Sequence, residues 1–113
     1  MTPASDPSVR ALFARVARRL ERPEAWTKGA YARDCDGKPA SHVFGETDVC
    51  WCLAGAIDRE RPGSGLRAAE AYAPVLERLG GQDIGRWNDH PSRSHAEVLA
   101  LVRSLAGDAT GEP

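Results

Sequence analysis

The chain has 113 residues, a length typical of one domain, and 42% of them are hydrophobic, which is enough for an ordinary core. Its 15 lysines and arginines face 16 aspartates and glutamates, and this balance argues against a protein that binds nucleic acid through a basic surface. No apolar stretch is long enough to span a membrane, three cysteines do not make a paired disulfide framework, and the first seven residues are unlike a signal peptide, so we expect a cytoplasmic protein with no membrane partner.

The first predicted element is a helix that starts at Ser5-Asp6-Pro7, a capping side chain followed by proline, and ends before Pro23. Apolar residues recur along it at helical spacing: Val9, Leu12, Phe13, Val16, Ala17 and Leu20. Arginines occupy much of the other face: Arg10, Arg15, Arg18, Arg19 and Arg22. We interpret this face as solvated, because charge is balanced elsewhere in the chain. The alternative is a nucleic-acid site, whose binding would depend steeply on salt.

Residues 24–46 have no regular periodicity, and the sequence leaves their structure open. Ala30-Tyr31-Ala32 could form a short helical turn. The stretch 34–39 is rich in turn formers and can support a short β-hairpin on either side of it.

Three more helices are predicted in the second half. Thr47-Asp48 can cap one that runs to about Arg61. The next runs from about Leu66 to Leu79, ends at Gly80-Gly81, and should be kinked or split by Pro74. Residues 82–93 are expected to connect it to the last helix, which a capping box introduces and an apolar stripe stabilises: Ser94 with Glu97, then Val98, Leu99, Leu101, Val102 and Leu105.

The predicted fold class is therefore mainly α, with about four helices and a short irregular or β-hairpin segment between the first and second. One domain is expected to cover residues 1–113, with its core at about 7–106 and flexible tails at 1–5 and 107–113.

Cys50 and Cys52 are the residues on which cysteine-dependent catalysis could be built. If Thr47 caps the second helix, Cys50 lies in its first turn, where the helix dipole lowers the pKa of a thiol. Asn88 or Asp89 could orient a general base, which would have to come from one of three histidines: His42, His90 or His95.

The alternative is that both thiols are small, buried and inert, and we favour it because such cysteines are common. Cys52, Gly55 and Ala56 would then form a small-residue surface that another helix approaches closely, and Gly55→Leu should lower the melting temperature. On a helix, Cys50 and Cys52 would point about 200° apart and could not share an ion. We therefore expect no metal site and no cofactor.

Trp87-Asn88-Asp89 is the second distinctive run. If Trp87 docks on the core within a loop, it holds the two polar side chains in place beside it. We expect Asn88 to bond backbone groups. Asp89 is expected to be exposed in a binding site, since a carboxylate without a partner is costly to bury.

These features share their order with a known family. The order runs from Trp26 and Gly29-Ala30, through Cys52-Leu53-Ala54-Gly55-Ala56 and Trp87-Asn88-Asp89, to a capped helix with Glu97-Val98-Leu99. Over about residues 8–106 the chain resembles a small family of bacterial and phage proteins of unknown function. The resemblance implies that Cys52 and the pair Asn88-Asp89 are the recurring polar features, that Cys35 and Cys50 are incidental, and that no family motif contains the histidines.

The sequence thus favours a small accessory or interaction protein, regulatory in role, that binds an unidentified protein or small molecule near Trp87, Asn88 and Asp89. The alternative is a small cysteine-dependent enzyme with Cys52 or Cys50 as the nucleophile and Asn88 and Asp89 in support.

Overall fold

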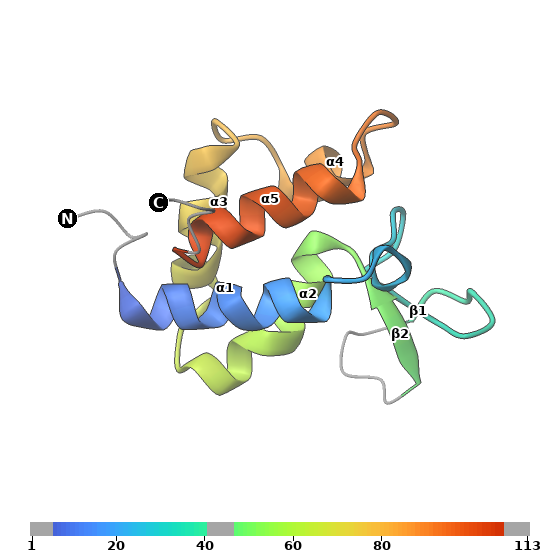
Figure 1. The fold of residues 1–113 in the computed structure, drawn as a ribbon, viewed down its shortest axis with the longest axis horizontal. Helices are drawn as coiled ribbons and strands as arrows, with labels where there is room; N and C mark the ends of the chain where they lie inside the picture. Colours follow the sequence, from blue (N-terminus) through green and yellow to red (C-terminus); the bar gives the residue numbers. More distant parts are fainter. Residues whose placement is uncertain (1–5, 41–46, 108–113) are drawn as a thin grey trace.

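The computed structural model describes residues 6–40 and 47–107 (Figure 1). Within these ranges the chain forms five α-helices, two 3₁₀ helices and a two-stranded sheet. In chain order they are α1 (Pro7–Arg19), η2 (Pro23–Ala25), β1 (Ala32–Asp34), β2 (Asp48–Trp51), α2 (Leu53–Glu60), η3 (Arg61–Ser64), α3 (Ala68–Arg78), α4 (Ile84–Asp89) and α5 (His95–Leu105). The predicted class is confirmed: mainly α, with a short antiparallel hairpin between the first two helices. No helix of the described ranges has the length and apolarity to cross a membrane.

The core forms around α1, which packs against α5 and α2 (Figure 1). The predicted cap is present, because the Asp6 side chain accepts a hydrogen bond from the Ser8 amide at 2.8 Å. The expected apolar stripe is buried and meets apolar residues of every longer helix: Val9, Leu12, Phe13 and Val16 from α1, with Leu53, Ile57, Val75, Val98 and Val102. The hairpin and α4 lie toward one end of these packed helices (Figure 1).

The arginine face of α1 is partly committed to contacts within the chain. Arg15 and Arg19 both pair with Glu60, at 3.4 Å and 2.6 Å, and the Arg19 guanidinium lies 4.5 Å from the Trp51 ring centroid. These contacts join α1 to α2 and β2. They weaken the nucleic-acid alternative, because two of its basic side chains share an ion pair with Glu60 and are less available to phosphates.

The hairpin corrects the predicted start of the second helix. Asp48–Trp51 is strand β2, which pairs antiparallel with β1, so that Ala32 lies opposite Trp51. The prediction that Thr47-Asp48 caps a helix is therefore wrong, and α2 begins at Leu53 with Cys52 as its N-cap. Val49 is β-branched and Trp51 is aromatic, and such residues favour a strand when a partner strand is available. The partner here is β1, which lies in an earlier segment of the chain. For the same reason Ala32 belongs to β1 and not to a helical turn.

Helix α3 runs through Pro74 as one helix, so of the two predicted effects, a kink or a split, the split does not occur. Pro74 is fully buried, and its packing against the core compensates for the backbone hydrogen bond that a proline cannot donate. The glycine stop is confirmed, since Gly80 and Gly81 have φ of 64° and 86° directly after the helix.

The segment expected to be a plain connection contains helix α4. Its N-cap is Asp83, whose side chain accepts a hydrogen bond from the Arg86 amide at 3.0 Å. Trp87, Asn88 and Asp89 therefore lie on a short helix and not in a loop, and the loop interpretation is wrong. After this helix the predicted capping box of α5 is confirmed, with reciprocal hydrogen bonds between Ser94 and Glu97.

Candidate functional site

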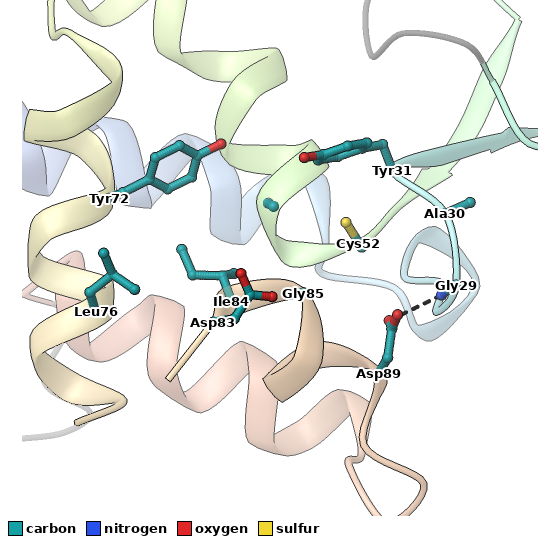
Figure 2. A pocket seen from close by; sticks show the side chains of 11 residues that line it. Gly29, Ala30, Tyr31, Cys52, Tyr72, Leu76, Asp83, Ile84, Gly85 and Asp89 are labelled. Atoms are coloured by element: carbon teal, nitrogen blue, oxygen red, sulfur yellow. Dashed lines mark hydrogen bonds between the residues drawn. The ribbon is translucent and has the colours of Figure 1, made fainter. Parts of the chain in front are cut away.

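A cleft of about 540 Å³ opens beside the start of α2 (Figure 2). Its volume is within the range of sites that bind small molecules. Four parts of the chain line it: the segment before β1 (Gly29, Ala30, Tyr31), the start of α2 (Cys52, Ala54), α3 (Tyr72, Leu76), and α4 with its cap (Asp83, Ile84, Gly85, Asp89).

Cys52 lines this cleft and joins α2 to the segment before β1. Its thiol sulfur accepts a hydrogen bond from the Gly55 amide at 3.3 Å, which caps α2. Its own amide donates to the Tyr31 carbonyl at 3.1 Å, which holds the segment before β1 against the helix. The residue is only 6% exposed. Cys52 is thus a structural N-cap whose sulfur faces a cavity.

The surroundings of Cys52 favour the neutral thiol. Burial is the largest effect and raises the pKa of Cys52. Hydrogen bonds from the Gly55 and Ala54 amides oppose it by lowering the pKa. The negative charges of Asp89 and Asp58 raise the pKa of Cys52 further, because they disfavour a thiolate nearby. The net shift is upward, which is the opposite of an activated nucleophile.

Asn88 lies behind the cleft and is fully buried. Its Oδ1 accepts hydrogen bonds from Trp26 Nε1 at 2.7 Å and from the Leu53 amide at 3.0 Å. Its Nδ2 donates to the Thr27 carbonyl at 3.1 Å and to Asp89 Oδ1 at 2.9 Å. The expectation that Asn88 serves backbone groups is confirmed. One amide connects α4, the first amide of α2 and the segment before β1.

Asp89 is exposed, as expected, and faces the cleft (Figure 2). Its Oδ1 accepts hydrogen bonds from the Gly29 amide at 3.0 Å and from Asn88. These two donors hold the carboxylate on the same cavity as the thiol of Cys52. The structure therefore brings together two residues that the sequence singled out 37 positions apart.

The other sequence candidates lie elsewhere. Trp87 is only partly buried, does not line the cleft, and packs under the Arg93 guanidinium, 4.0 Å from the ring centroid. Cys50 is on β2 opposite Arg33, so it does not occupy a first helical turn, and it too is outside the cleft.

The histidines do not join Cys52 in the part of the chain that is described. His90 Nδ1 is bonded to Ser92, and His95 Nε2 lies 2.6 Å from the Leu20 carbonyl. His42 lies outside the described residues. Across residues 6–40 and 47–107 no group of three potential metal ligands occurs.

Tyr72 and Asp83 are among the lining residues that sequence reasoning missed. Tyr72 fitted the apolar stripe of its helix, but its ring faces the cleft and its hydroxyl donates to Asp58 Oδ1. Burial, followed by the carboxylate of Asp58, raises the pKa of Tyr72. Asp83 was placed in a connecting segment, although an aspartate ahead of Ile84 is a signal for a helix cap.

We expect Cys52 to react with iodoacetamide more slowly than the exposed Cys35, because its thiol is buried and its pKa is raised. Mass spectrometry of two variants, each with a single cysteine, measures both rates: Cys35→Ser with Cys50→Ser, and Cys50→Ser with Cys52→Ser. Adding Asp89→Asn to the first variant should speed labelling, since it removes a nearby negative charge. Faster labelling of Cys52 than of Cys35 would contradict this account and favour an activated thiol.

Comparison with known proteins yields one match. A family model described as "Family of unknown function (DUF6197)" matches residues 4–108. No curated protein and no solved structure shows significant similarity to the chain. The match spans all four parts of the chain that line the cleft.

Proposed function

The chain belongs to a family of unknown function, DUF6197, and we propose that it is a small accessory protein without catalytic activity that binds a ligand in the cleft beside Cys52 and Asp89. The bacterial or phage origin, the cytoplasmic location and a regulatory role are parts of the same proposal that rest on sequence reasoning alone.

One observation carries the proposal: Cys52 and Asp89 line a single cleft, and buried Asn88 supports both of its walls. The amide of Asn88 accepts from the first amide of α2 and donates to Asp89, so the two walls keep a defined separation. A cavity with pre-positioned polar groups and apolar walls is suited to binding.

The second candidate function is a cysteine-dependent enzyme with Cys52 as the nucleophile. Its supporting observation is that the sulfur caps a helix N-terminus and faces the cleft. A nucleophilic thiol needs a base or a lowered pKa. The pKa of Cys52 is raised, and the lining includes no histidine among the described residues, so binding is the better supported function.

A fragment screen by two-dimensional ¹H–¹⁵N NMR tests the binding function. We expect neutral and charged fragments that bind to shift the amide signals of Gly29, Ala54 and Gly85, which line the cleft. Ala54→Leu should abolish these shifts, because its larger side chain occupies the cleft. Ala73→Leu is the matched control, since it makes the same change at an exposed position of α3.

The spectrum of each variant also reports whether the variant is folded. If Ala54→Leu does not fold, Leu76→Trp is a second variant that fills the cleft. Fragment shifts confined to other surfaces would refute the cleft as a ligand site.

A further inference from the structure

We propose that the ligand of this cleft is a small organic cation, an ammonium or guanidinium group on an apolar stem. This inference rests on the proposed function and adds the chemical class of the ligand. Three features of the cleft support it: the sign of its charge, the position of its aromatic walls and the spacing of its carboxylates.

The charged groups of the lining are all negative. Asp83 and Asp89 both line the cleft, and its described lining includes no lysine, arginine or histidine. Neither carboxylate has a salt bridge with any described residue. Lys28, directly before Gly29, donates instead to the His90 carbonyl at 2.7 Å. The lining of the cavity therefore has two carboxylates that form no salt bridge with a described residue.

Each carboxylate is held in place and keeps an oxygen available. Asp89 uses Oδ1 for the Gly29 and Asn88 donors, and Asp83 uses Oδ2 for the Arg86 amide. No hydrogen bond between described residues engages the other oxygen of either group. A pre-positioned carboxylate binds a cationic donor well, because charge-assisted hydrogen bonds are the stronger ones and little side-chain freedom remains to be lost.

The opposite wall is aromatic and apolar. In Figure 2 the rings of Tyr31 and Tyr72 lie across the cavity from the two carboxylates, with Leu76 and Ile84 along one side. The hydroxyl of Tyr72 is bonded to Asp58, which fixes that ring. Tyrosine faces attract cations, and the aliphatic side chains suit an apolar stem. An anionic ligand would meet only repulsion from the two carboxylates.

The spacing of the carboxylates indicates where the charged group binds. Asp83 is the N-cap of α4 and Asp89 is its last residue, and six residues of helical rise separate their backbones by about 9 Å along the helix axis. Asp89 lies beside Cys52 and Gly29, where the polar groups of the cleft gather, so the cationic group binds there and Asp83 adds attraction from the other end of α4.

The test is an NMR titration with three probes of one shape: phenethylammonium, 2-phenylethanol and 3-phenylpropionate. We expect the cation alone to shift the amides of Gly29, Ala54 and Gly85. Asp89→Asn should weaken its binding by about tenfold or more, which is the scale of one charge-assisted hydrogen bond. The variant retains an oxygen to accept from the Gly29 amide, so the fold should persist.

Asp83→Asn gives a second, independent reading, because asparagine also caps helices. It should weaken binding less than Asp89→Asn. Glu21→Gln is the matched control, since it removes one exposed carboxylate outside the cleft and should leave the dissociation constant unchanged. A capped Gly-Arg-Gly peptide beside its citrulline analogue shows whether the cation can be presented by a polypeptide.

Equal shifts from the alcohol or the carboxylate would overturn the cationic ligand and leave the cleft as a binding site. Unchanged binding in both asparagine variants would do the same. No shift with phenethylammonium also overturns the inference, whereas the proposed function fails only if fragments of every charge leave the cleft amides unaffected.

Discussion

Gly55→Ala should lower the free energy of unfolding by about 3 kcal/mol or more, at the upper end of overpacking effects. A Cβ at this position would lie 2.1 Å from the carbonyl oxygen of Tyr31 and 2.9 Å from its carbonyl carbon. Both are backbone atoms, and the same carbonyl accepts from the Cys52 amide. Relief therefore requires the segment before β1 to move away from α2, which opens the wall of the cleft. Urea unfolding measures the loss.

Gly63→Ala is the matched control for this change. A Cβ at Gly63 meets nothing within 4 Å, and its φ is not in the left-handed region. We expect a change within about 0.5 kcal/mol, as is usual at open surface positions. Equal midpoints for the two alanine variants would show that the contact between Gly55 and Tyr31 is not a close one.

The sequence identified Gly55 for a reason that was partly right. Small residues at 52, 55 and 56 indicated that another part of the chain approaches α2 closely, and Gly55→Leu was expected to disrupt it. The approach is real, but the neighbour is the backbone at Tyr31 and not a second helix. Residue size along one helix shows that there is a close neighbour, and only the tertiary fold shows which one.

Elements with local signals were predictable. The cap at Asp6, the capping box of Ser94 and Glu97, and the glycine stop after α3 each depend on residues within a few positions of one another. Apolar periodicity then marked the buried faces of α1 and α5. Such signals survive in a single sequence because they need no distant partner.

Elements with weak local signals were missed. Strand β2 exists because β1 pairs with it from across a long connection, and the run Val49-Cys50-Trp51 reads equally well as the start of a helix. Helix α4 has six residues, too few for a periodic pattern. The first error placed Cys50 in a helical turn, and the second placed Trp87-Asn88-Asp89 in a loop.

In the candidate site too, single residues could be predicted from the sequence, whereas features that depend on distant contacts could not. Cys52 and Asp89 stood out as individual residues, but their common cavity depends on contacts between α2, α3, α4 and the segment before β1. Tyr72 was hidden in an apolar stripe, because periodicity cannot distinguish a ring that fills the core from one that borders a cleft.

Asn88→Leu should lower the free energy of unfolding by about 3–5 kcal/mol, because it removes every hydrogen bond of a buried amide and puts a larger side chain of the same branching in its place. The Trp26 indole N–H, the Leu53 amide and the Thr27 carbonyl would each lose a partner. Buried donors and acceptors without partners cost about 1–3 kcal/mol each. Gln82→Leu, at an exposed position, is the control for the change of side chain.

A double-mutant cycle with Trp26→Phe separates this network from a general packing effect. Phenylalanine removes the indole N–H that donates to Asn88 at 2.7 Å, so the double variant no longer leaves that donor unpaired. The two losses measured by urea unfolding should therefore sum to more than the loss in the double variant, by about 1–2 kcal/mol. Additive losses would mean that the hydrogen bond contributes nothing. Coupling of the expected size would show that the hydrogen bond between the Trp26 indole and Asn88 stabilises the fold.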